Sequence, residues 1–183
     1  MMRIMIIRHA EKPTGDGLFR GVTISGVHDK HDLSVRGWQR AGALVRFFAP
    51  LNGLGGHAPI STPRSIFASA AVAGSPSLRA KHTVSPLAEA LGLPVHANHP
   101  DGDEVGVAAA MLAAEGPVLV AWHHHHIPAL VREITQGALV CHTSWPEDRF
   151  DLVWVLDRPA ADGPWIFAQI VQRLLANDAD DVV

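Results

Sequence analysis

The side chains best suited to chemistry in this sequence are histidines and arginines that follow apolar, strand-like segments. Arg8 and His9 follow the first apolar segment of the chain, and His123 directly follows the strongest one. Arg79 stands near the start of a helix that is predicted after another strand. In parallel α/β sheets a ligand site lies beyond the carboxyl ends of the strands. We therefore expect these four residues to converge on one pocket.

Two imidazoles and two guanidinium groups in one pocket favour phosphoryl transfer. A neutral imidazole is a competent nucleophile near pH 7, because its reference pKa is about 6.5. Its attack on phosphorus gives a phosphohistidine that water can later hydrolyse. Guanidinium groups match the phosphate oxygens in shape and charge, and they stabilise the charge of the transition state. Such a site requires no metal ion or other cofactor.

The elements that must position these residues alternate between strands and helices. The predicted strands are apolar segments, and they cover residues 2–7, 65–69, 95–97, 118–122, 150–156 and 165–170. The predicted helices lie between them, and they cover residues 35–48, 77–91, 104–115 and 129–136. This alternation predicts an α/β fold, a three-layer α/β/α sandwich with a mainly parallel central sheet. The last two strands have only a short connection, so we expect them to be antiparallel.

Capping residues and helix breakers set the predicted helix ends. Ser34 is expected to cap the first helix, which is expected to end at Pro50 and the glycines that follow. Pro86 is expected to interrupt the second helix, and Gly92 to end it. The glycines that follow the first helix are Gly53, Gly55 and Gly56. Pro128 is expected to open the last helix and Gly137 to cap it.

Length and composition limit the class of protein. The chain has 183 residues and 48% hydrophobic residues, which predicts a single globular domain over 1–183, with residues 176–183 as a frayed acidic tail. The chain has 15 Lys and Arg residues and 18 Asp and Glu residues, so it lacks the excess of basic residues expected of a nucleic-acid binder. Its apolar segments are too short to span a membrane. Cys141 is the only cysteine, which excludes an intrachain disulfide and favours the cytoplasm.

Four motifs, in order along the chain, resemble those of the histidine phosphatase superfamily, the phosphoglycerate mutase-like proteins. Residues 6–10 are similar to the strand that ends in Arg-His-Gly or Arg-His-Ala, and residues 33–41 resemble its L-[ST]-x-x-G-x-x-[QR]-A helix start. Residues 75–83 resemble S-P-x-x-R-A-x-x-T, and residues 118–127 resemble the strand before the second catalytic histidine. The likeness covers nearly the whole chain and implies the phosphoglycerate mutase-like fold.

The resemblance implies a role for each matching residue. His9 corresponds to the nucleophile that forms the phosphohistidine, and Arg8, Arg79 and His123 correspond to the residues that bind the phosphoryl group. The implied activity is that of a phosphatase, a phosphoric monoester hydrolase, on a phosphorylated small molecule or a phosphoprotein. Four further residues are candidates for contact with the substrate or for orienting these groups: Lys12, Ser75, Thr83 and His124.

An alkyl leaving group needs a proton, which a partly buried carboxylic acid can supply. Glu104 is the first candidate, because it begins the helix after the strand at 95–97, near the expected carboxyl edge of the sheet. Asp103 is the alternative donor. Acidic residues at this position also stabilise a helix N-terminus, which is the competing interpretation.

Two other functions compete with a phosphatase. The run from His123 to His126 could bind a metal, but successive side chains point in different directions, so we expect no metal site there. A non-catalytic phosphate- or metal-binding protein of the same fold is the main alternative, and the intact set of histidines and arginines favours catalysis over it. A small phosphomutase is a further alternative. The connection between Arg79 and His123 is short, which favours the phosphatase.

Overall fold

A computed structural model describes residues 1–15, 19–51, 59–139 and 142–183 of the chain. Cys141 and the glycines predicted to follow the first helix lie outside the described residues. No helix in the described part of the chain is both long and apolar enough to cross a membrane.

A six-stranded sheet in the order β3-β2-β4-β1-β5-β6 forms the centre of the molecule. The strands are β1 (Met2–Arg8), β2 (Ser65–Ala68), β3 (Val95–His96), β4 (Val118–Trp122), β5 (Leu152–Arg158) and β6 (Ile166–Val171). The four strands from β3 to β1 are parallel, while β5 pairs antiparallel with both β1 and β6. The predicted antiparallel pairing of the last two strands is confirmed.

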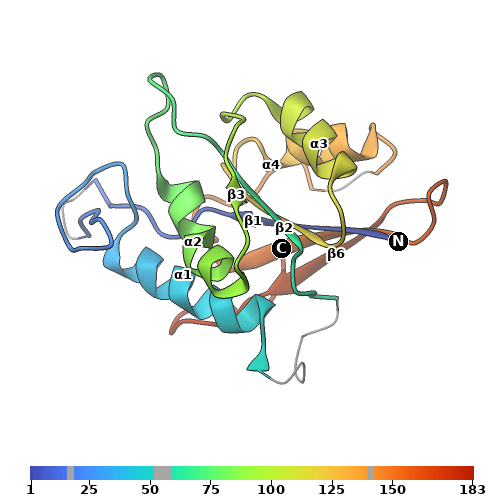
Figure 1. Ribbon diagram of the computed structural model, residues 1–183. Helices are drawn as coiled ribbons and strands as arrows, with labels where there is room; N and C mark the ends of the chain where they lie inside the picture. Colours follow the sequence, from blue (N-terminus) through green and yellow to red (C-terminus); the bar gives the residue numbers. More distant parts are fainter. Residues whose placement is uncertain (16–18, 52–58, 140–141) are drawn as a thin grey trace.

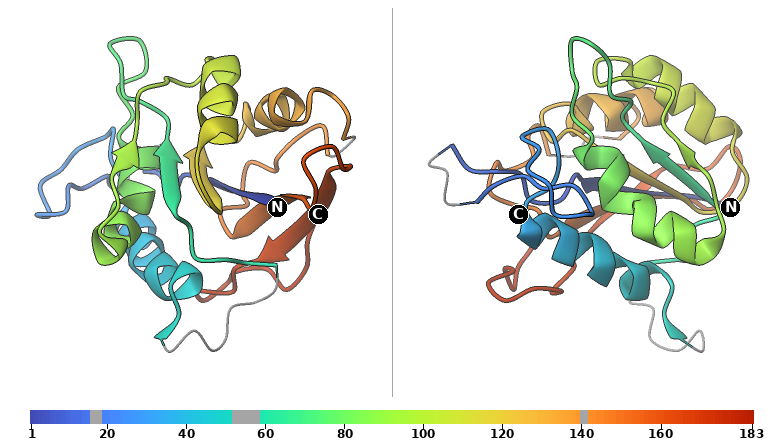
Figure 2. Two further views of the ribbon diagram at one scale, coloured as in Figure 1. Left: turned by 45° about the vertical axis from the view of Figure 1, so that its right-hand side comes forward. Right: turned by 60° about the vertical axis from the view of Figure 1, so that its left-hand side comes forward.

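Four helices cover the two faces of this sheet. They are α1 (Val35–Phe48), α2 (Arg79–Leu91), α3 (Glu104–Ala113) and α4 (Ile127–Thr135). Helices α1 and α2 lie together on one face, and α3 and α4 lie together on the other (Figures 1 and 2). The predicted three-layer α/β/α sandwich with a mainly parallel sheet is confirmed.

The central strands are apolar along their whole length because both of their faces are buried. In β1, Ile4 and Ile6 contribute to the core under α3 and α4, while Met5 and Ile7 contribute to the core under α1 and α2. All five residues of β4 are buried in the same alternating way. A two-sided burial of this kind explains why the sequence shows no period-two alternation there.

Helix α1 begins as predicted and packs closely on the segment after β1. The hydroxyl of Ser34 accepts a hydrogen bond from the Gly37 amide at 3.1 Å, which satisfies one of the free donors of the first turn. A side chain at Gly37 would collide with the backbone of Glu11. The glycine therefore lets the helix approach the segment that carries His9.

Helix α2 differs from its prediction in two ways. It begins at Arg79 instead of Ser77, and it continues through Pro86 to Leu91 without interruption. A proline inside a helix removes one backbone hydrogen bond, and here the buried face of α2 against α1 and the sheet holds the helix together across that position. Gly92 ends the helix in the left-handed conformation, with φ 65°, as predicted.

The other helix ends are close to their predicted positions. Asp103 caps α3 by accepting a hydrogen bond from the Gly106 amide at 3.1 Å. Pro128 lies in the first turn of α4, as predicted. The cap residue at the other end of α4 is Gln136, with φ 52°, and Gly137 follows it in the same left-handed region.

Part of the acidic C-terminal segment, which covers residues 176–183, is anchored to the fold, while its last four residues are exposed. The carboxylate of Asp178 receives hydrogen bonds from Arg40 at 2.6 and 3.1 Å and from the amides of Leu174 and Leu175. The amide of Ala179 donates to Asp151 at 2.8 Å. A buried arginine is the reason that this segment packs against the fold.

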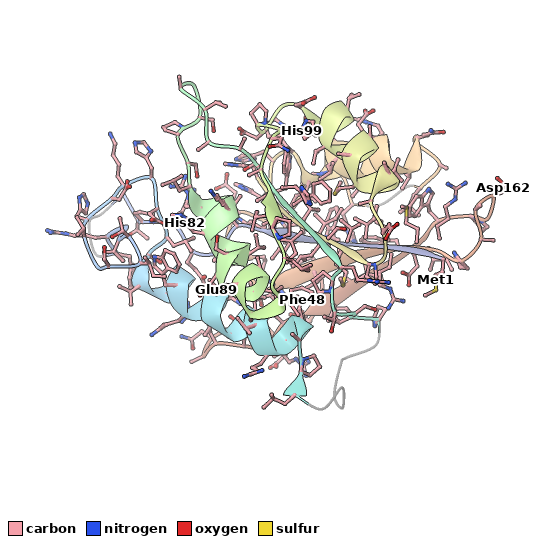
Figure 3. All side chains as sticks on the ribbon, viewed as in Figure 1. Met1, Phe48, His82, Glu89, His99 and Asp162 are labelled. Atoms are coloured by element: carbon pink, nitrogen blue, oxygen red, sulfur yellow. The ribbon has the colours of Figure 1, made fainter. Side chains whose placement is uncertain are left out.

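The carboxyl ends of β1, β2 and β4 meet at one edge of the sheet, as parallel strands require. The long segment between β1 and α1 gathers at this edge (Figure 1). In Figure 3, His82 of α2 lies at this end of the molecule, whereas Met1 and Asp162 lie at the opposite end. The predicted site residues follow the strands at the His82 end.

Candidate active site

His9 stands immediately beyond β1, beside the end of β4. Arg8 pairs with Trp122 in the β1–β4 register, so that His9 and His123 leave the sheet side by side. The His9 amide donates to the carbonyl of Trp122 at 3.1 Å. The two imidazole rings lie edge to face, with centroids 5.5 Å apart. The parallel register thus brings together residues that are far apart in sequence.

One hydrogen bond fixes the tautomer of His9. Its Nδ1 lies 2.8 Å from the carbonyl oxygen of Ala10. A carbonyl can only accept, so Nδ1 carries the proton in the neutral ring and Nε2 keeps its lone pair. Among the described residues, the bond from Nδ1 is the one hydrogen bond of the ring, and none involves Nε2. The ring is therefore oriented as a nucleophile.

Burial keeps His9 uncharged. Only 3% of the residue is exposed, and this burial lowers the pKa of the imidazole well below 6.5. The hydrogen bond to the Ala10 carbonyl opposes the shift, while the positive charges of Arg8 and Arg79 and the nearby His123 add to it. A histidine surrounded in this way is neutral at pH 7.

Arg8 is a buried guanidinium that is only partly paired. Its Nη1 donates to the backbone carbonyl of Glu147, and the group lies 3.9 Å above the centre of the Phe150 ring. Its Nε and Nη2 are buried and have no partner among the described residues. Burial lowers the pKa of Arg8 to about 10, against the opposing effect of nearby acidic residues. Unused donors in a buried cation attract an anion.

Arg79 is the first residue of α2, and its charge acts on the two histidines of the site. Its Nη1 donates to the carbonyl of Lys30 at 3.3 Å, and its Nε is buried without a partner among the described residues. Burial lowers its pKa, while the carboxylates of Asp32 and Asp29 oppose that shift. Its charge in turn lowers the pKa of His9 and of His123.

His123 is the histidine of the four-residue run that faces His9. Burial lowers its pKa, and the charges of Arg79 and Arg8 contribute to the same direction. The carboxylate of Asp101 lies 3.8 Å from its Nδ1 and opposes the shift. The structure thus brings together all four of the residues expected to converge: Arg8, His9, Arg79 and His123.

Thr83 holds this set in place and does not face the solvent. Its hydroxyl accepts a hydrogen bond from the Ala10 amide at 2.7 Å and donates one to the Arg79 carbonyl at 2.7 Å. The residue is fully buried, and both of its hydrogen bonds are to backbone groups that flank the site. It is a positioning residue that joins the turn after β1 to the start of α2.

The other three residues expected to contact a substrate differ in their surroundings. Lys12 is exposed and lines a cavity of about 420 Å³ together with Phe150 and Glu147. The backbone of Ser75 pairs with that of Val72 in the loop before α2. No described contact joins Ser75 to the histidines or arginines of the set. His124 is buried beside His125.

The carboxylates expected to donate a proton are engaged in local contacts. Glu104 accepts hydrogen bonds from the Trp122 indole at 3.0 Å and from the Gly102 amide at 2.9 Å, and lies 3.3 Å from Nδ1 of His126. Asp103 caps α3, and its hydrogen bond with His99 lowers its pKa. That shift favours the ionised form of Asp103 and makes it a weaker candidate for the acid.

Sequence reasoning missed three parts of the site. Phe150 stacks under Arg8, and its ring centroid lies 6.1 Å from that of His9. Backbone carbonyls of the loop before β5 accept hydrogen bonds from Nη1 of Arg8. Asp32 is fully buried and bonded to Nδ1 of His82 at 2.7 Å. The only available signal was that Asp32 directly precedes the motif at 33–41 and that His82 lies within the motif at 75–83.

Comparison with solved structures identifies the fold. The chain is similar to the protein histidine phosphatase SixA, solved with tungstate: TM-score 0.58, 20% identity, 93% of this chain and 97% of the other covered. It is also similar to the mycobacterial glucosyl-3-phosphoglycerate phosphatase Rv2419c, solved with VO3: TM-score 0.52, 17% identity, with 90% and 96% covered. No protein-family model and no curated protein matches the sequence.

Proposed function

We propose that the chain is a phosphatase that works through a phosphohistidine on His9. Its fold is that of the histidine phosphatases, in agreement with the resemblance seen in the sequence. The observation that carries this proposal is a buried, neutral imidazole with a free Nε2, surrounded by two arginines whose buried donors lack partners. Such a site is complementary to a phosphoryl group in charge and in hydrogen bonding.

The first step transfers the phosphoryl group to the enzyme. The lone pair on Nε2 of His9 attacks phosphorus, the bond from phosphorus to the leaving oxygen breaks, and that oxygen takes a proton from an acid. Arg8 and Arg79 donate hydrogen bonds to the phosphoryl oxygens as charge shifts among them, and His123 supplies a further donor beside His9. The Ala10 carbonyl stabilises the positive charge that develops on the imidazole.

The second step returns the enzyme to its starting state. Water attacks phosphorus, the bond from phosphorus to Nε2 breaks, and inorganic phosphate leaves. The water gives up its proton to the group that protonated the leaving oxygen. The arginines hold the phosphoryl oxygens through both steps, so that their charge replaces the one that a metal ion would supply.

The two similar structures are named for two different classes of substrate. SixA is named a protein histidine phosphatase, and Rv2419c is named a glucosyl-3-phosphoglycerate phosphatase. For this chain we propose a phosphorylated metabolite or a phosphoprotein, with Lys12 placed to contact a substrate near Phe150. Measuring phosphate release from panels of phosphorylated metabolites and of phosphoproteins would separate the two classes.

Labelling His9 tests the mechanism directly. Rapid quenching without acid, during turnover of a labelled phosphomonoester, is expected to leave label on His9. His9→Asn is expected to remove both the label and the turnover. His96→Asn, a change of an exposed histidine on β3, is the matched control and retains both. Undiminished turnover in His9→Asn would exclude the mechanism.

Chelation tests whether the reaction requires a metal. Dialysis against a chelator is expected to leave the rate unchanged, since the arginines provide the positive charge. Vanadate or tungstate is expected to inhibit by occupying the phosphoryl pocket. A loss of activity on chelation that zinc restores would overturn the metal-independent mechanism. Oxyanion binding without turnover of any substrate would instead identify a non-catalytic phosphate-binding protein.

The proton donor is proposed to be Glu104, with Asp101 as the alternative because its carboxylate lies 3.8 Å from Nδ1 of His123. An aryl phosphate releases a phenolate without help, whereas an alkyl phosphate needs the proton. Glu104→Gln is therefore expected to slow the alkyl ester selectively, and Asp101→Asn is the comparison. Equal slowing of both esters by Glu104→Gln would show that its carboxylate serves only the contacts to Trp122 and Gly102.

A further inference from the structure

Beside the phosphoryl pocket, two loops bring together a cluster that the proposed mechanism does not use. His124 and His125 come from the turn between β4 and α4, and Glu147 comes from the loop before β5. One potential ligand atom from each residue lies within 4.8 Å of the other two. Neighbouring histidines in one run supply only two of these atoms, so the cluster depends on the approach of the second loop.

His124 has a buried nitrogen that nothing in the described structure satisfies. The residue is 5% exposed, and its Nε2 is buried without a hydrogen-bond partner. Leaving a buried polar atom unpaired is costly, and such an atom calls for an explanation. The neighbouring ring of His125 lies 3.7 Å away, centroid to centroid. The neighbour of His124 is thus a second imidazole and not a carbonyl or a carboxylate.

The ligand types select the kind of ion. Two imidazoles and a carboxylate suit zinc and similar divalent transition metals, while magnesium and calcium prefer oxygen ligands alone. Zinc bonds to such ligands at about 2.0–2.2 Å, so the three atoms must draw closer together around an ion. His125 and Glu147 are exposed side chains and can rotate to do so.

We propose that the His124–His125–Glu147 cluster is a binding site for one divalent transition-metal ion of the zinc class. The fourth position of a tetrahedral ion would be open to water. The site uses none of the four residues that are proposed to bind the phosphoryl group, and the chemistry proposed for His9 does not pass through it.

An ion at this cluster would connect two loops that both serve the phosphoryl pocket. The turn before α4 carries His123, and the backbone carbonyl of Glu147 accepts a hydrogen bond from Arg8. The charges of Arg8 and Lys12 act on His124, and their repulsion weakens the hold on a cation. The site therefore suits an exchangeable ion.

Titrating the metal-free full-length chain with Co²⁺ and Zn²⁺ tests the proposal. The expected result is one saturable Co²⁺ site with the visible absorption of a four- or five-coordinate ion, which Zn²⁺ displaces. His125→Asn and Glu147→Gln are each expected to weaken binding about tenfold or more, a loss of about 1.4 kcal/mol. Both changes are at exposed positions, so folding is kept, as circular dichroism would verify.

Two matched controls separate a built site from general attraction. Asp148→Asn removes the same charge from the next residue, and His126→Asn removes a histidine of the same run that instead contacts Glu104. Both are expected to bind the ion as the parent chain does. The proposal is overturned if Glu147→Gln binds normally, or if the controls lose as much affinity. Because the readout is metal binding, it is independent of whether the chain is a phosphatase.

Discussion

Arg8 and Arg40 are the two arginines that are almost completely buried, with 1% and 2% exposure among the described residues, yet their surroundings are opposite. Arg40 donates to Glu11 at 2.8–3.1 Å, to Gln172 at 2.9 Å and to Asp178 at 2.6 and 3.1 Å. Arg8 donates only to backbone carbonyls through one nitrogen, and its other two nitrogens lack partners in the described structure.

The ionisation of the two side chains follows from this difference. Hydrogen bonds and charges from Asp178 and Glu11 raise the pKa of Arg40, although burial opposes them. Burial dominates at Arg8 and lowers its pKa to about 10. A buried cation that is fully paired contributes to the fold, whereas one with free donors is ready for an anion. Pairing, more than burial, distinguishes Arg40, which is bound within the fold, from Arg8, which we propose binds the phosphoryl group.

Removing Arg40 is expected to produce the largest effect on stability. Arg40→Ala leaves Arg36 as the only cation near the carboxylates of Glu11 and Asp178 among the described residues. Breaking a buried ion pair in this way costs about 3–5 kcal/mol of the free energy of unfolding. Chemical denaturation would measure it. A loss below about 1 kcal/mol, typical of an exposed pair, would show that the network does not hold the C-terminal segment.

Changing Arg8 is expected to affect catalysis more than folding. Arg8→Lys keeps a positive charge but removes the planar fork, and the loss of one such donor costs about 10²–10³ in kcat, or about 2.7–4 kcal/mol. Steady-state kinetics on an aryl phosphate would measure the loss. Arg46→Lys, an exposed arginine of α1, is the matched control. Equal rates in the parent and Arg8→Lys would remove Arg8 from the phosphoryl site.

An oxyanion is expected to complete the pairing that Arg8 lacks. Tungstate at about 100 times its Kd is expected to raise the free energy of unfolding by about 2.7 kcal/mol, because it binds only the folded chain. Thermal unfolding with and without tungstate would show the shift in Tm. The shift is expected to persist in Arg46→Lys and to shrink in Arg8→Lys. A shift of the same size in both variants would place the anion elsewhere.

Acid is expected to destabilise the fold by a smaller amount through His9. Its pKa in the folded chain is lowered, so below about pH 6.5 the unfolded chain binds a proton that the folded chain does not. Stability is therefore full above pH 6.5 and falls by about 1.4 kcal/mol per pH unit below it. Arg8, Arg79 and His123 face the imidazole, and together with burial they lower its pKa in the folded chain.

The variant His9→Gln isolates this contribution. It removes the titrating group, so its stability is expected to fall less steeply than that of the parent between pH 6.5 and 5. Urea denaturation at several pH values would give both slopes. Parallel slopes in the two proteins would mean that His9 takes up its proton as easily in the folded chain as in the unfolded one.

Much of the fold was predictable because its signals are local. The apolar segment 118–122 is the strand β4 with no change of bounds, and Ser34 caps α1 as its type and position indicate. The strand-to-histidine junctions placed Arg8, His9 and His123 at one edge of the sheet. Pro86 misled the prediction, because packing of α2 outweighs one missing backbone hydrogen bond.

The sequence by itself determined which groups stand at the carboxyl edge, because strands, caps and motifs are encoded by neighbouring residues. Only the tertiary structure decided how those groups are paired. Arg40 meets Asp178 across 138 positions and Arg8 meets the loop at Glu147 across 139, and nothing local distinguishes the two arginines. Whether a buried charge is satisfied or left open depends on residues that only the folded chain brings within hydrogen-bonding distance.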